Sequence, residues 1–124
     1  VYGPRALRLL GTKADGWVPS LPTMPLGQLS EKSSRIDDAA REAGRDPAEI
    51  RRVANVNGRI TDGPSAGYLQ GPADQWVDEL TALAIEHGID GFVLWSDGDP
   101  VEQAARFAEI AEVTRSTVAA ARGL

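Results

Sequence analysis

Helical and strand-like patterns alternate strictly along the 124 residues, and this alternation constrains the fold more than any other feature. Strict alternation predicts βα units, and such units form parallel sheets with right-handed crossovers. The helical segments are Pro4–Lys13, a helix from within Met24–Ser30 to Ala43, one from Pro72 to His87, and one from Asp99 to about Ala121. The strand-like segments between them are Asp15–Pro19, Arg52–Ile60 and Ile89–Ser96.

The ends of the predicted helices carry the residues that begin and end helices. Pro4 and Pro72 suit a first helical position, because proline lacks the N–H that would be unpaired there. Gly44 is typical of the residue just beyond a helix. Asp99 and Glu102 form a capping-box pattern, with Asp in the usual place of Ser or Thr.

The segment Ile89–Ser96 is nearly all apolar, which predicts a strand buried on both faces, as in parallel sheets. A doubly wound sheet and a segment of a (βα)8 TIM barrel both fit the alternation. No Gly-x-Gly-x-x-Gly motif follows a strand, so dinucleotide binding of the doubly wound type has no support. Three strands would also make a very small doubly wound sheet. We therefore expect an α/β fold that is part of a (βα)8 barrel.

Composition excludes several function classes. A net charge of −5 argues against nucleic-acid binding, which needs a basic surface. Apolar runs are shorter than the roughly 18 residues of a membrane span. The absence of cysteine is consistent with a cytoplasmic protein, and the single histidine, His87, leaves no metal-site spacing.

Four stretches resemble the bacterial luciferase-like monooxygenase superfamily of flavin- and deazaflavin-dependent oxidoreductases. They are GPRALRLLGTKADGWVPS (Gly3–Ser20), IDDAAREAGRDPAEI (Ile36–Ile50), GPADQWVDELTALAIEHGIDGFVLW (Gly71–Trp95) and DGDPVEQAARFAEIA (Asp97–Ala111). They occur in the family's own order along nearly the whole chain. The resemblance implies that residues 1–124 form a single C-terminal half-barrel, comprising a helix followed by the last three βα units.

The resemblance also implies that the first turn binds the phosphate of the cofactor, through Tyr2, Gly3, Pro4 and Arg5. The residues suit this role, since glycine permits close approach and a helix N-terminus offers unpaired N–H groups. A helix cap without a ligand is the alternative. The implied cofactor is coenzyme F-420 or FMN. The Ala-, Arg- and Asp-rich helices are typical of high-GC genomes, which favours F-420 slightly.

Three candidates for a pocket wall lie at or just after the ends of predicted strands, where barrel enzymes place their sites: Trp17, Trp95 and Asp97. Two further candidates, Asn55 and Asn57, share one face of the predicted strand Arg52–Ile60 with Val53, and if that face points into the barrel their amides could bind a ligand or each other. Core packing for the tryptophans and a structural network for the two amides are the alternatives. The loop Thr61–Gln70, with Tyr68, could be a substrate lid or a plain mobile loop.

No pair of nucleophile and base stands out, so the catalytic residues are unknown. In the implied family the cofactor carries the reaction and the protein binds and orients. We expect this chain to be the C-terminal part of a flavin- or deazaflavin-dependent oxidoreductase or monooxygenase. We expect the chain alone to be inactive. A non-catalytic, self-associating half-barrel and a small-molecule binding domain without redox chemistry remain alternatives.

A half-barrel predicts self-association. Its two sheet edges, near Asp15–Pro19 and Ile89–Ser96, would offer unpaired backbone groups, and its inner face would be apolar. We expect a dimer or a larger homo-oligomer in sedimentation experiments. A clean monomer at high micromolar concentration would contradict this expectation.

Overall fold

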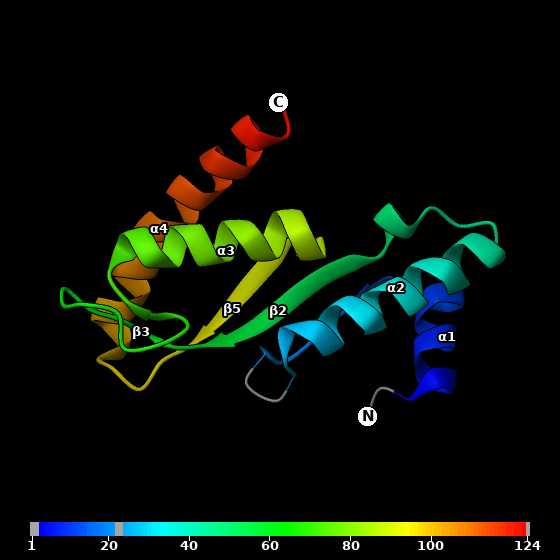
Figure 1. The fold of residues 1–124 in the computed structure, drawn as a ribbon, viewed down its shortest axis with the longest axis horizontal. Coiled ribbons are helices and arrows are strands. Elements are labelled where there is room, and N and C mark those ends of the chain that lie inside the picture. Colours follow the sequence, from blue (N-terminus) through cyan, green and yellow to red (C-terminus); the bar gives the residue numbers. More distant parts are fainter. Residues whose placement is uncertain (1–2, 22–23, 124) are drawn as a thin grey trace. The chain divides into compact units, whose positions relative to one another are not determined.

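The computed structural model describes residues 3–21 and 24–123, so Tyr2 of the predicted phosphate turn lies outside the described residues. The elements are, in chain order, α1 (Pro4–Lys13), β1 (Gly16–Trp17), α2 (Leu26–Glu42), the short 3-10 helix η2 (Pro47–Glu49), β2 (Arg51–Asn57), β3 (Arg59–Ile60), β4 (Gln70–Gly71), α3 (Ala73–His87), β5 (Gly91–Trp95) and α4 (Pro100–Ala121) (Figure 1). Two compact units divide the chain, one of residues 1–55 and 89–92, the other of residues 56–88 and 93–124. All four predicted helices are confirmed.

The central sheet has the order β1-β2-β5, with β1 and β2 parallel. The arrows of β2 and β5 point the same way in Figure 1. Along β2, burial alternates with the period of two that a strand imposes: Arg52, Ala54 and Val56 are buried, while the residues between them are less so. The parallel arrangement expected from the βα pattern is therefore confirmed.

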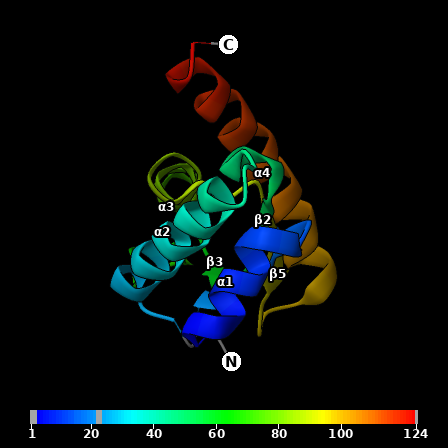
Figure 2. The ribbon, with the colours of Figure 1, turned by 90° about the vertical axis from the view of Figure 1, so that its right-hand side faces the viewer.

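In the first unit, α1 packs against α2 through Leu7 and Gly11, and the two helices lie beside each other in Figures 1 and 2. Helix α2 buries the face that its periodicity predicts, including Leu29 and Ile36, both 0% exposed. Gly44 has φ of 75°, which ends the helix as expected.

A buried arginine ties β2 to α2 in the same unit. Arg52 is 6% exposed, and its guanidinium donates to Ser33 Oγ and to the carboxylate of Asp37. The Arg52 N–H donates to Asp90 Oδ2 at 2.9 Å. Because a buried charge is tolerated only when it is paired, this arginine fixes α2 on the sheet.

The prediction that Ile89–Ser96 is buried on both faces is wrong. Val93 is 42% exposed and Trp95 is 59% exposed, and both belong to β5. The residues that alternate with them are partly buried. The apolar run is therefore not buried on both faces, because the side chains of Val93 and Trp95 are exposed to solvent.

The single strand predicted over Arg52–Ile60 is also wrong, since it breaks at Gly58. A Cβ at that position would lie 2.1 Å from the Leu69 carbonyl oxygen and 2.7 Å from the Trp76 ring. The chain then continues as β3, which pairs in parallel with β4 in a separate two-stranded sheet. The last residue of the predicted loop Thr61–Gln70 therefore belongs to a strand, because Gln70 lies in β4 and pairs with Arg59 of β3.

In the second unit, α3 and α4 pack against each other. Trp76 is 0% exposed and meets Phe107 edge to face, with ring centroids 5.9 Å apart. Asp99 caps α4 by accepting from the Glu102 N–H at 2.9 Å, as predicted. The reciprocal half of the capping box is not formed among the described residues, where the Glu102 carboxylate instead pairs with Arg106 at 3.6 Å.

None of the helices in the part of the chain that the structure describes has both the length and the apolar character needed to cross a bilayer.

The backbone contact at Gly58 gives a stability test. Gly58→Ala should destabilise the protein by about 1–3 kcal/mol, because the new methyl group overlaps the Leu69 carbonyl and the Trp76 ring. Gly63→Ala is the matched control, since a Cβ there meets nothing within 4 Å. Urea unfolding of both variants measures the difference. Equal stability of the two variants would contradict the packing at Gly58.

Candidate functional site

A pocket of about 500 Å³ lies in the second unit, where β2 and β5 end. The last residues of these strands, Asn57 and Trp95, both line it. The Gly58 N–H donates to the Trp95 carbonyl at 3.1 Å and so joins the two strand ends. The remaining lining residues follow the strands directly or belong to β3 and β4: Gly58, Arg59, Gln70, Ser96 and Asp97.

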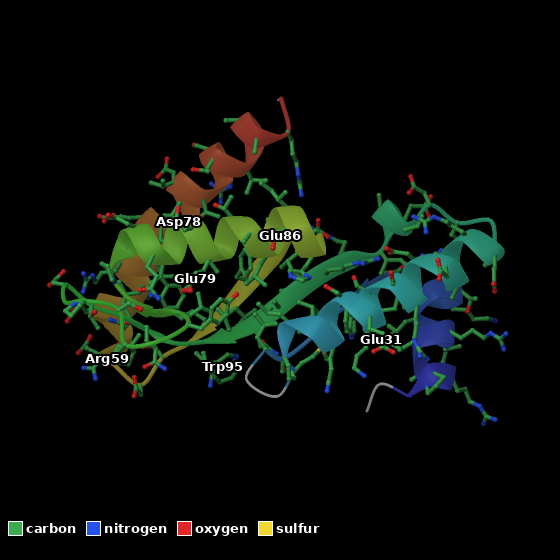
Figure 3. The ribbon with its side chains drawn as sticks, viewed as in Figure 1. Glu31, Arg59, Asp78, Glu79, Glu86 and Trp95 are labelled. Atoms are coloured by element: carbon green, nitrogen blue, oxygen red, sulfur yellow. The ribbon has the colours of Figure 1, made fainter. Side chains whose placement is uncertain are left out.

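The pocket combines one aromatic surface with several polar groups. The Trp95 indole is 59% exposed, and Asn57, Arg59 and Asp97 are also exposed. In Figure 3 the labelled Arg59 and Trp95 lie on the lower side of the view, below the strands, while Glu79 and Glu86 lie on α3. An exposed indole can stack on the planar ring of a ligand. Amide, guanidinium and carboxylate groups can form hydrogen bonds with the edges of that ligand ring.

The backbone of Arg59 is fixed, and its side chain is exposed. The Arg59 N–H donates to the Leu69 carbonyl at 3.0 Å, and its carbonyl accepts from Trp76 Nε1 at 3.3 Å. No ion pair of the Arg59 guanidinium forms among the described residues. This cation is therefore available to an anionic or carbonyl group in the pocket.

Gln70 is held at the pocket by an anchored loop. Leu69, which precedes it, has φ of 56° and is 1% exposed, and its N–H donates to Glu79 Oε1 at 2.7 Å. Gln75 Nε2 donates to the Gly67 carbonyl at 2.6 Å and to the same Glu79 oxygen at 3.0 Å. Because α3 holds the loop at both residues, its end next to the pocket forms a fixed wall.

Tyr68 lies in this loop and has an unusual acidity. Burial, together with the negative charges of Glu79 and Glu86, raises the pKa of its phenol to about 12. The phenol is therefore neutral at physiological pH and can donate a hydrogen bond.

Two other predicted wall residues lie in the first unit and do not line the pocket. Asn55 Nδ2 donates to Ser20 Oγ at 3.1 Å, which is the structural role that the sequence left open. Trp17 is 3% exposed and is part of the core. Of the five predicted wall residues, the pocket thus contains Asn57, Trp95 and Asp97.

The predicted phosphate turn precedes α1 in the first unit. Gly3 is the N-cap, Pro4 occupies the first turn, and no side chain caps the free N–H groups. Arg5 is exposed and forms no ion pair within residues 3–21 and 24–123. Pro4 and Arg5 also line a depression of about 490 Å³, with Arg8, Arg35, Asp38, Ala39 and Glu42.

Sequence reasoning missed the pocket residues that follow the break in β2. A glycine inside a strand pattern signals a bulge or a close backbone approach, so Gly58 carried a usable signal. Gln70 and Ser96 carried none, because their places depend on how distant loops pack. Among the described residues, no group of acidic residues, with or without His87, has the geometry of a metal site.

Comparison with known proteins matches residues 1–66 to the family model described as luciferase-like monooxygenase. The phthiodiolone/phenolphthiodiolone dimycocerosates ketoreductase of Mycobacterium kansasii is 35% identical over 117 residues, which are 94% of this chain and 30% of that protein. The protein of the same name from Mycobacterium tuberculosis (strain ATCC 25618 / H37Rv) is 34% identical over 95 residues, covering 72% of this chain and 24% of its own length. The chain thus spans less than a third of these relatives.

Solved structures share the fold at low identity. A riboflavin lyase with modified FMN and riboflavin superposes with a TM-score of 0.71 at 14% identity, over 94% of this chain and 42% of that one. An F420-dependent secondary alcohol dehydrogenase with an F420-acetone adduct gives 0.70 at 16% identity, over 90% and 46%. A long-chain alkane monooxygenase gives 0.60 at 15% identity, over 100% and 40%.

The acidity of Tyr68 can be measured directly. In a Tyr2→Phe variant Tyr68 is the sole tyrosine, and its tyrosinate absorbance should rise with a midpoint near pH 12, against about 10 in the unfolded chain. Since the folded state holds this proton more tightly, the stability it contributes is present below pH 10 and falls as the pH approaches 12. Glu86→Gln should lower the midpoint. A midpoint of 10 in the folded protein would contradict the assignment.

Proposed function

The chain belongs to the luciferase-like monooxygenase family, and we propose that it forms the C-terminal part of the (βα)8 barrel of a flavin- or deazaflavin-dependent oxidoreductase. In this proposal it contributes a cofactor-phosphate turn and part of the barrel mouth. Its own 124 residues are inactive alone, because they correspond to 46% or less of the length of the barrel structures above.

The observation that carries the proposal is the pocket at the ends of β2 and β5. Two adjacent parallel strands end there, and barrel enzymes keep their sites at that edge. The pocket offers the exposed Trp95 indole as a flat apolar surface, with the amides of Asn57 and Gln70 beside it. A flavin or deazaflavin ring is flat and has hydrogen-bonding edges, so this set of residues fits such a ring.

The turn before α1 fits a phosphate. Gly3 has φ of −70°, and a Cβ there would meet nothing within 4 Å, so neither backbone strain nor packing requires glycine. Close approach of a ligand remains a reason for its presence. The N–H groups of α1, which no described side chain caps, and the exposed Arg5 guanidinium supply donors and positive charge.

When bound, the cofactor supplies hydride transfer or O₂ activation. The residues of this chain would orient the cofactor and substrate and enclose them in the pocket. Trp95 covers one side of the pocket, Arg59 attracts negative charge to it, and Asp97 accepts hydrogen bonds from substrate or cofactor. Tyr68, in the loop before Gln70, keeps its phenol proton because its pKa is raised, so it can donate a hydrogen bond as well as accept one.

The names of two similar proteins favour redox chemistry at a carbonyl or hydroxyl carbon. One is a ketoreductase and the other is an F420-dependent alcohol dehydrogenase. We therefore favour coenzyme F-420 over FMN and a ketone or secondary alcohol as the substrate class.

Self-association is the second candidate function. Val93 and Trp95 leave β5 with an exposed apolar face, and a second copy could cover it. Such an interface would cover Trp95, which also lines the pocket. A dimer and a bound cofactor would then compete for the same surface, and the dimer should dissociate when cofactor is added.

The phosphate turn can be tested with a substitution that separates capping from binding. Gly3→Ser should stabilise α1 by a few tenths of a kcal/mol, because its hydroxyl caps a free N–H group. The same hydroxyl should compete with the phosphate and weaken cofactor binding. Arg5→Gln should weaken binding about tenfold through loss of a charge-assisted bond.

Titration of FMN and of coenzyme F-420, followed by visible absorbance, measures both effects. Gly63→Ser and Arg115→Gln are the matched controls, since both positions are exposed and lie outside the phosphate turn and the pocket. Unchanged affinity in Gly3→Ser and Arg5→Gln would refute the phosphate site. Failure of the chain to bind either cofactor would count against the cofactor function as a whole.

A further inference from the structure

Gln103 is a polar residue within the buried stripe of α4, where it is 4% exposed. Its carboxamide pairs with the backbone of Ile60 in β3: Oε1 accepts from the Ile60 N–H at 2.8 Å, and Nε2 donates to the Ile60 carbonyl at 2.9 Å. The side chain thus satisfies both backbone groups of one residue, as a neighbouring strand would do.

The same carboxamide also holds the turn that follows β5. Gln103 Oε1 accepts from Ser96 Oγ at 3.1 Å, and Ser96 Oγ accepts in turn from the Gly98 N–H at 3.2 Å. Gly98 packs directly on the side chain, since a Cβ at Gly98 would lie 3.0 Å from Gln103 Cγ. Asp97 lies between these two fixed residues and lines the pocket.

One side chain therefore connects the two turns that form the pocket walls. Ile60 follows Arg59 on one wall, and Ser96 and Asp97 form the other. No apolar residue could replace Gln103, because Ile60 would keep a buried N–H without its close partner.

We propose that Gln103 is the positioning residue of the pocket, setting the distance between the Asn57–Arg59 wall and the Trp95–Asp97 wall. The proposal rests on the proposed function for its ligand, a flavin or deazaflavin ring, and on the hydrogen bonds above for its geometry. Gln103 acts through Ile60 and Ser96 and is not itself a lining residue.

The first test reads the pocket without a ligand. The chain labelled with 5-fluorotryptophan gives a ¹⁹F resonance for each of its three tryptophans, and loss of one signal in Trp95→Phe assigns that of Trp95. Gln103→Leu should shift and broaden the Trp95 resonance. Ile110→Ala, on the same buried stripe of α4, is the matched control. It should lower the melting temperature and leave the Trp95 resonance in place.

A conservative variant tests the donor and acceptor pattern. Gln103→Glu keeps the acceptor for Ile60 N–H and Ser96 Oγ, but when ionised it faces the Ile60 carbonyl with a negative charge. Its protonated form donates to that carbonyl and restores the pattern. The native Trp95 resonance should therefore return in this variant as the pH falls. Arg106 contacts the same carbonyl and pairs with Asp62 and Glu102, so the unsubstituted chain is measured at each pH as the reference.

The second test measures dissociation constants for FMN and coenzyme F-420, corrected for the folded fraction. Gln103→Leu should weaken binding about tenfold, and Ile110→Ala should not change it. If Gln103→Leu leaves both the Trp95 resonance and the cofactor affinity unchanged, as Ile110→Ala should, Gln103 is only a core residue and the proposal is overturned. If the resonance shifts but neither cofactor binds the unsubstituted chain, the positioning role stands and the proposed function fails.

Discussion

Parallel pairing of β2 with β5 is the constraint on which the pocket depends. Parallel strands end at the same edge of a sheet, so Asn57 and Trp95 meet there although they are far apart in sequence. The hydrogen bond from the Gly58 N–H to the Trp95 carbonyl closes this edge. Just beyond it the backbone packs closely on Leu69 and Trp76, so only a glycine fits at position 58. An antiparallel β5 would carry Trp95 to the opposite edge and leave no pocket.

The two neighbouring strands β2 and β5 differ in how far their apolar side chains are exposed to solvent. Ala54 and Val56 are fully buried, while Val93 and Trp95 on β5 are exposed. A doubly wound sheet would have helices on both faces, whereas a barrel stave has helices outside and other staves within. The exposed apolar side chains of β5 are those expected of a strand from part of a barrel, and the chain covers less than half the length of the similar barrel structures. Because Trp95 of the apolar strand β5 is exposed, it can line the pocket.

Local signals predicted the helices, and long-range contacts determined what the sequence did not reveal. Pro4, Gly44 and Asp99 mark helix ends through backbone chemistry that acts within a few residues, and those predictions are confirmed. Trp95 and Asp97, chosen for their place at a strand end, and Asn57, chosen for its strand face, line the pocket, and their role in binding stays a prediction. The break at Gly58, the pairing of β3 with β4 and the role of Gln103 depend on contacts between distant segments. In the sequence, Gln103 is one polar residue within an amphipathic helix. Its role is evident only from the structure, where its carboxamide bonds to the backbone of Ile60.

The most direct test of the central claim is an NMR titration of the ¹⁵N-labelled chain with FMN and with coenzyme F-420. If the strand-end pocket takes the ring, the largest shifts should fall on the Trp95 indole N–H, the Asn57 and Gln70 side-chain amides and the backbone from Ser96 to Gly98. The Asn55 amide, bound to Ser20 outside the pocket, should shift little. Saturable binding with shifts elsewhere and none at Trp95 or Asn57 would contradict the account.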